Sequence, residues 1–263
     1  MKSAMTKPVQ YDKRAISIAP VLSSKDTRAS STESELLRAT SINVTVAGEK
    51  KPRNYKHVIS TMPLACLRMV DTAQCGFSWN LQTAIRALHY DPCVKVGIRF
   101  SRRWWEDASL ARGAHHGGAS STDRPARTVV YPSHGINEKT GATMIASYTW
   151  AEDAMRIGSL ANSPSELLVV AGIIKDLADM HQMDHDVLAN LVEDYKIHEW
   201  SADDTIMGQS QCYKIFIIKR LTCYSGGGAS FGPSQFRSLY PEITRPVGGL
   251  LHFAGEATSV HHV

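Results

Sequence analysis

One stretch near the carboxyl end of the sequence combines a short apolar strand with residues that suit ligand binding. Residues 250–253 are followed by small and polar side chains, namely Gly255, Glu256, Thr258 and Ser259. A glycine after a strand lets the backbone come close to a phosphate or a cofactor ring, and a hydroxyl residue caps the next helix. Glu256 would accept a hydrogen bond from such a ligand. The alternative interpretation is an ordinary turn between a strand and a helix.

A lysine on a predicted strand is the second candidate. Over residues 94–100 apolar side chains alternate with others, which places Lys95, Gly97 and Arg99 together on the face away from the core. Two interpretations stay open for Lys95: a solvated strand face, or an ammonium group that faces a reaction site.

Two aromatic residues, Tyr148 and Trp150, end another predicted strand at residues 144–148. At a strand end such residues are either part of the core or the lining of a pocket. In both cases the Tyr148 hydroxyl needs a hydrogen-bond partner.

Two further motifs suggest competing chemistry. His181 and His185 have the spacing that puts two imidazoles on one helix face, but no glutamate follows His181, so we expect a solvated helix end and no metal site. Residues 228–232 match G-x-S-x-G, which would make Ser230 the nucleophile of a serine hydrolase. The required later acid and histidine would be Glu242 or Glu256 and His261.

The elements that must position these residues follow from hydrophobic periodicity. Strands are predicted at residues 8–18, 41–47, 57–60, 94–100, 144–148 and 250–253, and loops at 23–35 and 109–126. Helices are predicted at residues 80–90, 151–160, 165–180 and 185–195. We expect the strands at 41–47 and 57–60 to share one sheet, and the first and last thirds of the chain to share a sheet. This order indicates an α/β or α+β protein.

Composition narrows the function classes. The 263 residues carry a formal charge of +4 and are 43% hydrophobic and 21% charged, as is typical of globular proteins. The basic residues are scattered, so nucleic acid is not an expected partner. The five cysteines are odd in number, and there is neither an apolar leader nor a run of about 18 apolar residues. We therefore expect a cytoplasmic protein without a membrane span.

Residues 251–259 resemble the C-terminal FAD-binding signature of flavin-containing amine oxidases, in particular of the fungal L-amino-acid oxidases. Other segments resemble this family in the same order along the chain, namely residues 55–64, 94–100, 104–107, 147–154 and 231–233. The resemblance implies an α/β fold with a partial FAD-binding (Rossmann-like) domain and an inserted α+β substrate domain of mixed sheet and helices. The implied domains are residues 1–92, the middle of the FAD-binding domain; 93–208, the substrate domain; and 228–263, the C-terminal FAD-binding segment.

The resemblance also implies roles for single residues. Lys95 would be bridged by water to flavin N5, where its charge stabilises the reduced ring. Tyr148 would bind the substrate carboxylate, and Trp150 would line the substrate pocket. The residues at the cofactor would be Gly255, Glu256, Thr258 and Ser259. The implied reaction converts a primary amine, expected to be an L-amino acid, and oxygen into an oxo acid, ammonia and hydrogen peroxide.

The sequence departs from the family pattern in three places. None of its 18 glycines forms the GxGxxG loop that holds the FAD pyrophosphate. The N-terminal part that carries a substrate-binding arginine and the C-terminal helix are also missing, so we expect a truncated member. Residues 209–227 replace only a few residues of the family, and we interpret them as an insertion or a gene-model error. A non-catalytic remnant of an amine oxidase is therefore an alternative, ahead of a serine hydrolase.

Overall fold

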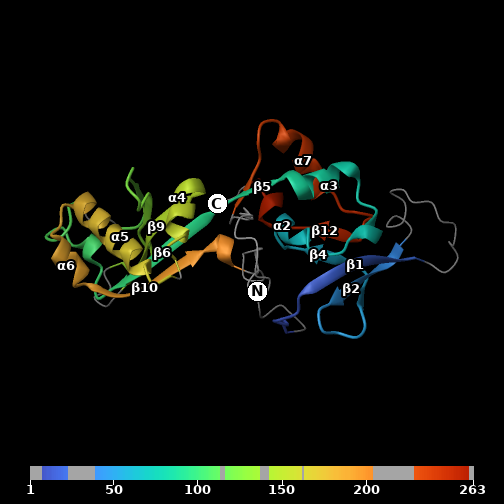
Figure 1. The fold of residues 1–263 in the computed structure, drawn as a ribbon, viewed down its shortest axis with the longest axis horizontal. Coiled ribbons are helices and arrows are strands. Elements are labelled where there is room, and N and C mark those ends of the chain that lie inside the picture. Colours follow the sequence, from blue (N-terminus) through green and yellow to red (C-terminus); the bar gives the residue numbers. More distant parts are fainter. Residues whose placement is uncertain are drawn as a thin grey trace. The chain divides into compact units, whose positions relative to one another are not determined.

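The computed structural model describes residues 8–22, 39–112, 116–136, 142–161, 163–203 and 228–260. The predicted loop at 23–35 and the segment 209–227 lie outside these residues. The chain divides into two compact units (Figure 1). Unit 1 contains Met1–His89 and Ala229–Val263, and unit 2 contains Tyr90–Gly228. The chain passes between them at β5 (His89–Asp91) and β11 (Gly228–Ser230), which pair with each other.

Unit 1 contains two small sheets. Strands β1 (Ala15–Leu22), β2 (Ala39–Val46) and β3 (Arg53–Tyr55) form an antiparallel sheet in that order. Strands β4 (Val58–Ser60) and β12 (Leu251–Phe253) form a parallel pair. The helical elements of this unit are α2 (Leu64–Leu67), η2 (Ala73–Cys75), α3 (Trp79–Ala87), α7 (Gln235–Thr244) and η6 (Glu256–Thr258). Helices α3 and α7 pack against each other (Figure 1).

Strand β1 is at one edge of its sheet and runs through Pro20. The Ile18 amide points away from β2 and donates to the Asp71 carbonyl at 2.9 Å, while the Asp71 amide donates to the Ile16 carbonyl. Two residues further along, the amide position of Pro20 points to the same outer side, so the proline removes no hydrogen bond to β2. The prediction that the strand ends at residue 18 was therefore wrong.

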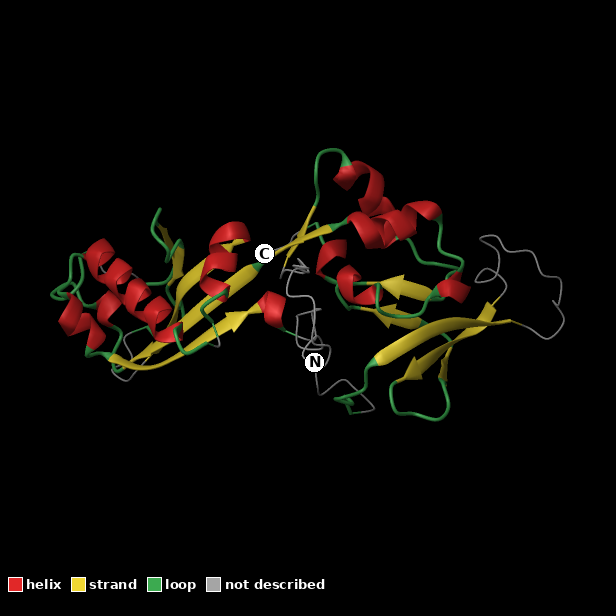
Figure 2. Cartoon of the chain, viewed as in Figure 1, coloured by secondary structure: helices red, strands yellow, loops and turns green. Residues whose placement is uncertain are grey.

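Unit 2 is built on one antiparallel five-stranded sheet in the order β10-β6-β9-β8-β7 (Figure 2). Its strands are β6 (Cys93–Phe100), β7 (Ala119–Ser121), β8 (Thr128–Val130), β9 (Ala142–Trp150) and β10 (Val192–Glu199). The predicted loop at 109–126 thus contains a short edge strand. The helical elements are η3 (Trp104–Glu106), α4 (Ala151–Gly158), α5 (Glu166–His181), α6 (His185–Ala189) and η4 (Trp200–Ala202).

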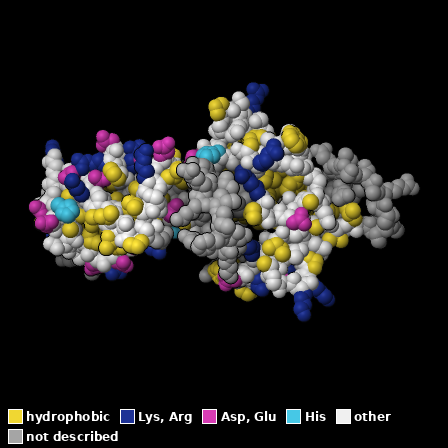
Figure 3. All heavy atoms as spheres, in the orientation of Figure 1, with side chains coloured by type: hydrophobic (Ala, Val, Ile, Leu, Met, Phe, Trp, Pro, Cys, Tyr) yellow, Lys and Arg dark blue, Asp and Glu magenta, His cyan; other side chains and the backbone are white. Residues whose placement is uncertain are grey.

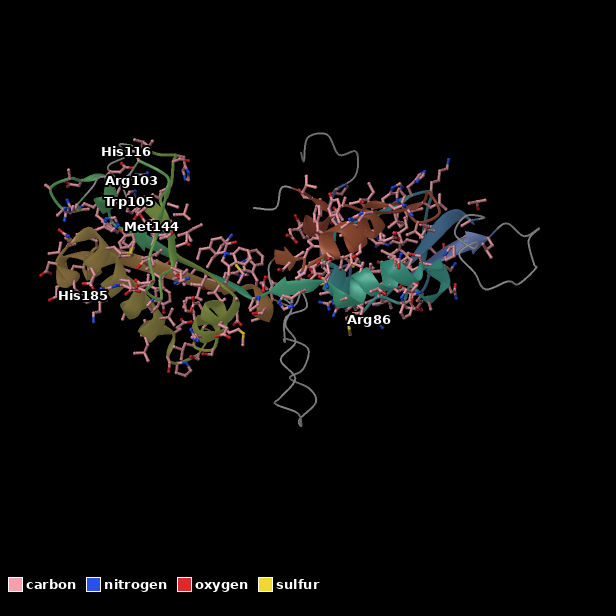
Figure 4. The ribbon with its side chains drawn as sticks, turned by 90° about the horizontal axis from the view of Figure 1, so that it is seen from above. Arg86, Arg103, Trp105, His116, Met144 and His185 are labelled. Atoms are coloured by element: carbon pink, nitrogen blue, oxygen red, sulfur yellow. The ribbon has the colours of Figure 1, made fainter. Side chains whose placement is uncertain are left out.

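The core of unit 2 lies on the sheet face that carries the alternating apolar residues of β6. Val94, Val96, Ile98 and Phe100 are fully buried, and α4 and α5 pack against this part of the sheet. One buried charge is compensated inside the core: Arg103 forms an ion pair with Glu106 at 2.6 Å and lies 5.3 Å from the Trp105 ring centroid (Figure 4). The alternation in β6 was predicted correctly because a strand that buries one face has a period of two.

Two predictions about the arrangement of strands gave different results. The strand at 57–60 does not share a sheet with the strand at 41–47, because β4 pairs with β12 and β2 pairs with β1 and β3. That same β4–β12 pair confirms that the first and last thirds of the chain share a sheet. Partner choice in sheets depends on contacts distant in sequence, and local periodicity does not encode it.

The predicted helix at 185–195 is wrong in its second half. Asp184 caps α6 by accepting hydrogen bonds from the amides of Asp186 and Val187, but the helix ends at Ala189. Residues from Val192 onward form β10, which pairs with β6 over seven positions up to Glu199. Pairing with a buried central strand therefore outweighs the local helical pattern.

The mixture of helices and strands confirms the predicted α/β fold class. Charges of both signs are interspersed on the visible face of unit 2 (Figure 3). Within this unit, Arg127 and Arg156 both form ion pairs with Asp153. Among the described residues, no helix is long and apolar enough to cross a membrane.

Candidate active site

A row of side chains crosses the sheet of unit 2 on the face away from its core. Lys95 in β6 pairs with Tyr148 in β9 on one side and with His198 in β10 on the other. Thr128 in β8 pairs in turn with Tyr148. Directly opposite residues on adjacent strands put their side chains on the same face about 5 Å apart. The register therefore brings the predicted residues Lys95 and Tyr148 together.

The ammonium group of Lys95 lies over aromatic rings. Its Nζ is 4.5 Å from the ring centroid of Tyr148 and 5.8 Å from that of Trp200. Both distances are within the range in which the negative face of an aromatic ring attracts a cation. Lys95 is half-buried, so a simple solvated strand face does not describe it.

Tyr148 makes a further contact through its hydroxyl group. It shares a side-chain hydrogen bond with Cys93, a buried residue two positions before Lys95 on β6. Burial raises the pKa of Tyr148 far above its usual value, and Cys93 adds to this shift. Burial also raises the pKa of the Cys93 thiol. Both groups are protonated at neutral pH, as an ordinary tyrosine and cysteine are, and burial makes loss of either proton harder still.

Trp150 lies beside Tyr148 at the end of β9. The two ring centroids are 4.9 Å apart, and Trp150 is 40% exposed, so it is not a core residue. Its ring also packs against backbone, because a Cβ added at Gly228 would lie 2.9 Å from a ring carbon of Trp150. An exposed ring fixed on one side is suited to line a binding surface.

The other predicted group, the turn after β12, belongs to unit 1. A side chain at Gly255 would lie 3.2 Å from the Thr61 carbonyl oxygen, which favours glycine at this close approach. The exposed Glu256 carboxylate accepts a hydrogen bond from the Ala229 amide at 3.0 Å. Thr258 donates to the Gly255 carbonyl at 2.7 Å and closes the turn, which continues to Ser259. The predicted strand-to-helix turn is thus a strand followed by the single turn η6.

Comparison with known proteins identifies the family. The protein-family model that describes flavin-containing amine oxidoreductases matches residues 11–263 of this chain. This chain belongs to the flavin-containing amine oxidoreductases. It is 45% identical over 215 residues to a Dictyostelium discoideum protein named as a bifunctional amine oxidase, which covers 80% of this chain and 18% of that protein. It is 38% identical over 227 residues to L-amino-acid oxidase 4 of Hebeloma cylindrosporum, with 83% and 33% covered.

Solved structures of amine oxidases share the fold. A redesigned putrescine oxidase superposes with a TM-score of 0.63 at 14% identity, covering 94% of this chain and 43% of the other. Cyclohexylamine oxidase from Brevibacterium oxydans gives a TM-score of 0.62 at 12% identity, with the same coverage. The chain therefore spans about a fifth to a third of the first two sequence relatives and less than half of these structures.

The residues of unit 1 fit part of the flavin site that this family implies. Strands β4 and β12 are parallel, and their carboxyl ends meet at Ser60 and Phe253. Ligands of open α/β sheets bind outside the carboxyl ends of parallel strands. The buried Ser60 hydroxyl has no hydrogen-bond partner in the described part of the chain, and Glu256 is exposed at the same end. The turn would hold one end of FAD, while the sequence contains no GxGxxG loop for the pyrophosphate.

The two histidines of the spaced pair lie in different surroundings. His181 is buried rather than solvated as predicted, because its Nε2 is 2.8 Å from the Tyr131 hydroxyl and its ring packs edge-on against Trp104. His185 is exposed (Figure 4). Among the described residues, no group of three or more metal-ligating side chains occurs.

Ser230 lacks the geometry of a hydrolase nucleophile. It ends strand β11, and its backbone is not in the strained left-handed conformation of a nucleophile elbow. No histidine in the described ranges is hydrogen-bonded to it, and His261 lies outside them. The serine-hydrolase alternative therefore has no structural support.

Two residues near Lys95 were missed by sequence reasoning. They are Cys93 and Trp200. Cys93 has the same parity as Lys95 on β6, so the strand pattern could have placed it on the same face. Trp200 could not be placed, because residues 185–195 were predicted as a helix and β10 was not recognised.

Proposed function

We propose that this chain is part of a flavin-dependent enzyme that oxidises L-amino acids to oxo acids. The observation that carries the proposal is the pairing of Lys95 with Tyr148 and the exposed ring of Trp150, in a chain of the flavin-containing amine oxidoreductase family. The name of the fungal relative, L-amino-acid oxidase 4, supports the choice of substrate class.

The flavin supplies a two-electron acceptor when it is bound. The substrate loses a hydride from its α-carbon and a proton from its nitrogen, and the resulting imine reacts with water to give the oxo acid and ammonia. Oxygen takes up the two electrons and two protons to give hydrogen peroxide. The protein must therefore orient the amino acid and stabilise the charge that develops.

Tyr148 is suited to bind the substrate carboxylate. A tyrosine hydroxyl is protonated at neutral pH, and burial raises the pKa of Tyr148 further, so this group can donate a hydrogen bond to an anionic acceptor. Trp150 would supply the apolar surface for the amino-acid side chain.

Lys95 would supply a fixed positive charge. Its ammonium is held by rings on two neighbouring elements, so little reorganisation is needed when negative charge forms nearby. Glu256, in unit 1, would accept a hydrogen bond from the cofactor.

A second candidate is that this chain alone is not catalytic. The absence of a GxGxxG loop removes the backbone amides that bind a pyrophosphate, and each such contact contributes about 0.3–1 kcal/mol. If the purified chain does not retain FAD, this non-catalytic candidate is supported.

The test is to purify the chain, add FAD, and measure bound flavin absorbance together with peroxide formation on a panel of L-amino acids. Putrescine, cyclohexylamine and D-amino acids serve as comparison substrates. We expect peroxide to form with L-amino acids and to depend on FAD.

Lys95→Met is expected to lower the peroxide rate by roughly 100-fold, the usual effect of removing one electrostatic group at a reaction site. The matched control is Lys196→Met, since Lys196 is exposed on the neighbouring strand. A colourless protein that forms no peroxide would reject the chain as an autonomous enzyme and favour the non-catalytic candidate. Equal rates for both variants would remove Lys95 from the proposal.

A further inference from the structure

Trp200 reaches the row around Lys95 from a third element. It is the first residue of η4 and follows directly after β10. Because β10 pairs with β6, residue His198 is opposite Lys95, and Trp200 lies two positions further along. Nothing in the local sequence marks this tryptophan as part of a site.

The geometry gives Lys95 two aromatic neighbours on two different elements. Tyr148 comes from β9 on one side of β6, and Trp200 follows β10 on the other side. The Nζ of Lys95 is within 6 Å of both ring centroids, at 4.5 Å and 5.8 Å. Movement of the ammonium group toward either neighbouring strand is thus limited by a ring.

Trp200 is itself held in place. The His198 ring meets it edge-on, with centroids 4.3 Å apart and an interplanar angle of 86°. The Nε2 atom of His198 lies 3.7 Å from an Asp203 carboxylate oxygen. The Trp200 indole is therefore held by its contact with the His198 ring.

We propose that Trp200 is a positioning residue for Lys95: with Tyr148 it holds the ammonium group in one place by cation–π attraction. The role in oxidation rests on the proposed function, since it matters there only if Lys95 acts at the flavin. The positioning itself is a property of unit 2 and is measurable without cofactor or substrate.

The competing explanation is that Trp200 only covers the sheet. Both explanations expect that removal of the ring exposes Lys95. Only cation–π attraction expects the reactivity of Lys95 to depend on the electron density of an indole that keeps its shape.

The experiment measures how fast Lys95 reacts with an acetylating reagent at fixed pH, by mass spectrometry of the purified chain. Lys196, exposed on β10 two positions before His198, is the internal reference. Because only the uncharged amine reacts, loss of a ring that stabilises the ammonium should speed labelling. We expect Lys95 in Trp200→Leu to react about two- to five-fold faster than in the parent chain, with Trp200→Phe between them.

A second measurement keeps the indole in place. The chain is produced with fluorinated tryptophans, in which each added fluorine weakens the negative face of the ring while its size changes little. Labelling of Lys95 should rise stepwise with the number of fluorines, while Lys196 stays constant. If Trp200→Leu does not fold, this fluorination series still distinguishes cation–π attraction from simple covering of the sheet.

Trp79→Leu is the matched control. Trp79 is 70% exposed in unit 1, and the Arg86 guanidinium lies 5.6 Å from its ring centroid. The substitution therefore removes a cation–π contact that does not involve Lys95. Faster labelling in Trp200→Leu without any response to fluorination would show that the ring only shields Lys95, and the proposal would be overturned. A positive labelling result with no peroxide from the parent chain would instead overturn the proposed function alone.

Discussion

At the scale of single residues, the face to which a side chain belongs was predictable, but its neighbours across the sheet were not. Alternation in residues 94–100 places Lys95 away from the core, as the structure shows. The contacts of Lys95 with Tyr148 and Trp200 depend on which strands lie on each side of β6. That choice is made by tertiary packing, so a single sequence does not reveal it.

Cys75 provides a prediction about pH. Its thiol is buried in unit 1 and donates a hydrogen bond to the Ile18 carbonyl at 3.2 Å. Burial raises the pKa of Cys75 from 9.0 to about 12, with a smaller contribution from Asp71. Between these values the unfolded chain loses the proton and the folded chain keeps it. The free energy of unfolding should therefore fall as pH rises above about 9, by about 1 kcal/mol per pH unit from this group.

The measurement is chemical denaturation of the parent chain and of Cys75→Ala between pH 8 and 11. The alanine variant lacks this titration, so its stability should fall less steeply. Parallel pH profiles for the two proteins would contradict the assignment. Below pH 8 the difference between them should be constant, because the thiol is protonated in both states.

At the scale of elements, most predicted segments were found near their expected bounds, the short strands β4 and β12 included, and the segment at 185–195 was the clear failure. The helix predicted at 165–180 is α5 (Glu166–His181), whose 16 residues bury a continuous apolar face. The helix predicted at 185–195 is five residues of α6 followed by β10. A short helix gains little from its own hydrogen bonds, so pairing with β6 decides the conformation of the residues after it.

Gly172 is an opportunity to stabilise α5. It is an exposed residue in the helix interior, and a Cβ added there would meet nothing within 4 Å. Gly172→Ala should raise the free energy of unfolding by about 0.5–1 kcal/mol, because alanine loses less backbone entropy on folding. Thermal and urea denaturation would measure the change. The reverse substitution at the exposed neighbour, Ala171→Gly, should lower stability by a similar amount, and a loss of stability in Gly172→Ala would refute the prediction.

At the scale of the whole molecule, the chain contains two units with separate cores. The family resemblance predicted an α/β fold, and the family and the fold are confirmed. The sequence alone did not show that β4 pairs with the distant β12, which closes unit 1 from both ends of the chain. The parallel pair is also what places Gly255 and Glu256 beside the carboxyl end of β4.

Separate cores lead to a prediction about hydrogen exchange. Gly172→Ala should slow amide exchange in α5 and the strands of unit 2, and Cys75→Ala should speed exchange in β1 and η2 of unit 1. Each change should be confined to its own unit, because Gly172 belongs to an element of unit 2 and Cys75 to an element of unit 1. Mass spectrometry of peptides from both units would test this, and a change of equal size in both units would contradict it.

The outer edge of β1 has a consequence for how copies of the chain behave together. An edge strand with a row of unpaired amides and carbonyls is a template on which a strand of another molecule can add. In β1, the Ile16 carbonyl and the Ile18 amide are hydrogen-bonded to the backbone of Asp71. Pro20, at the next outward position, has no amide hydrogen to donate. The strand therefore presents no uninterrupted row of donors, and this edge of unit 1 is protected against self-association by strand addition.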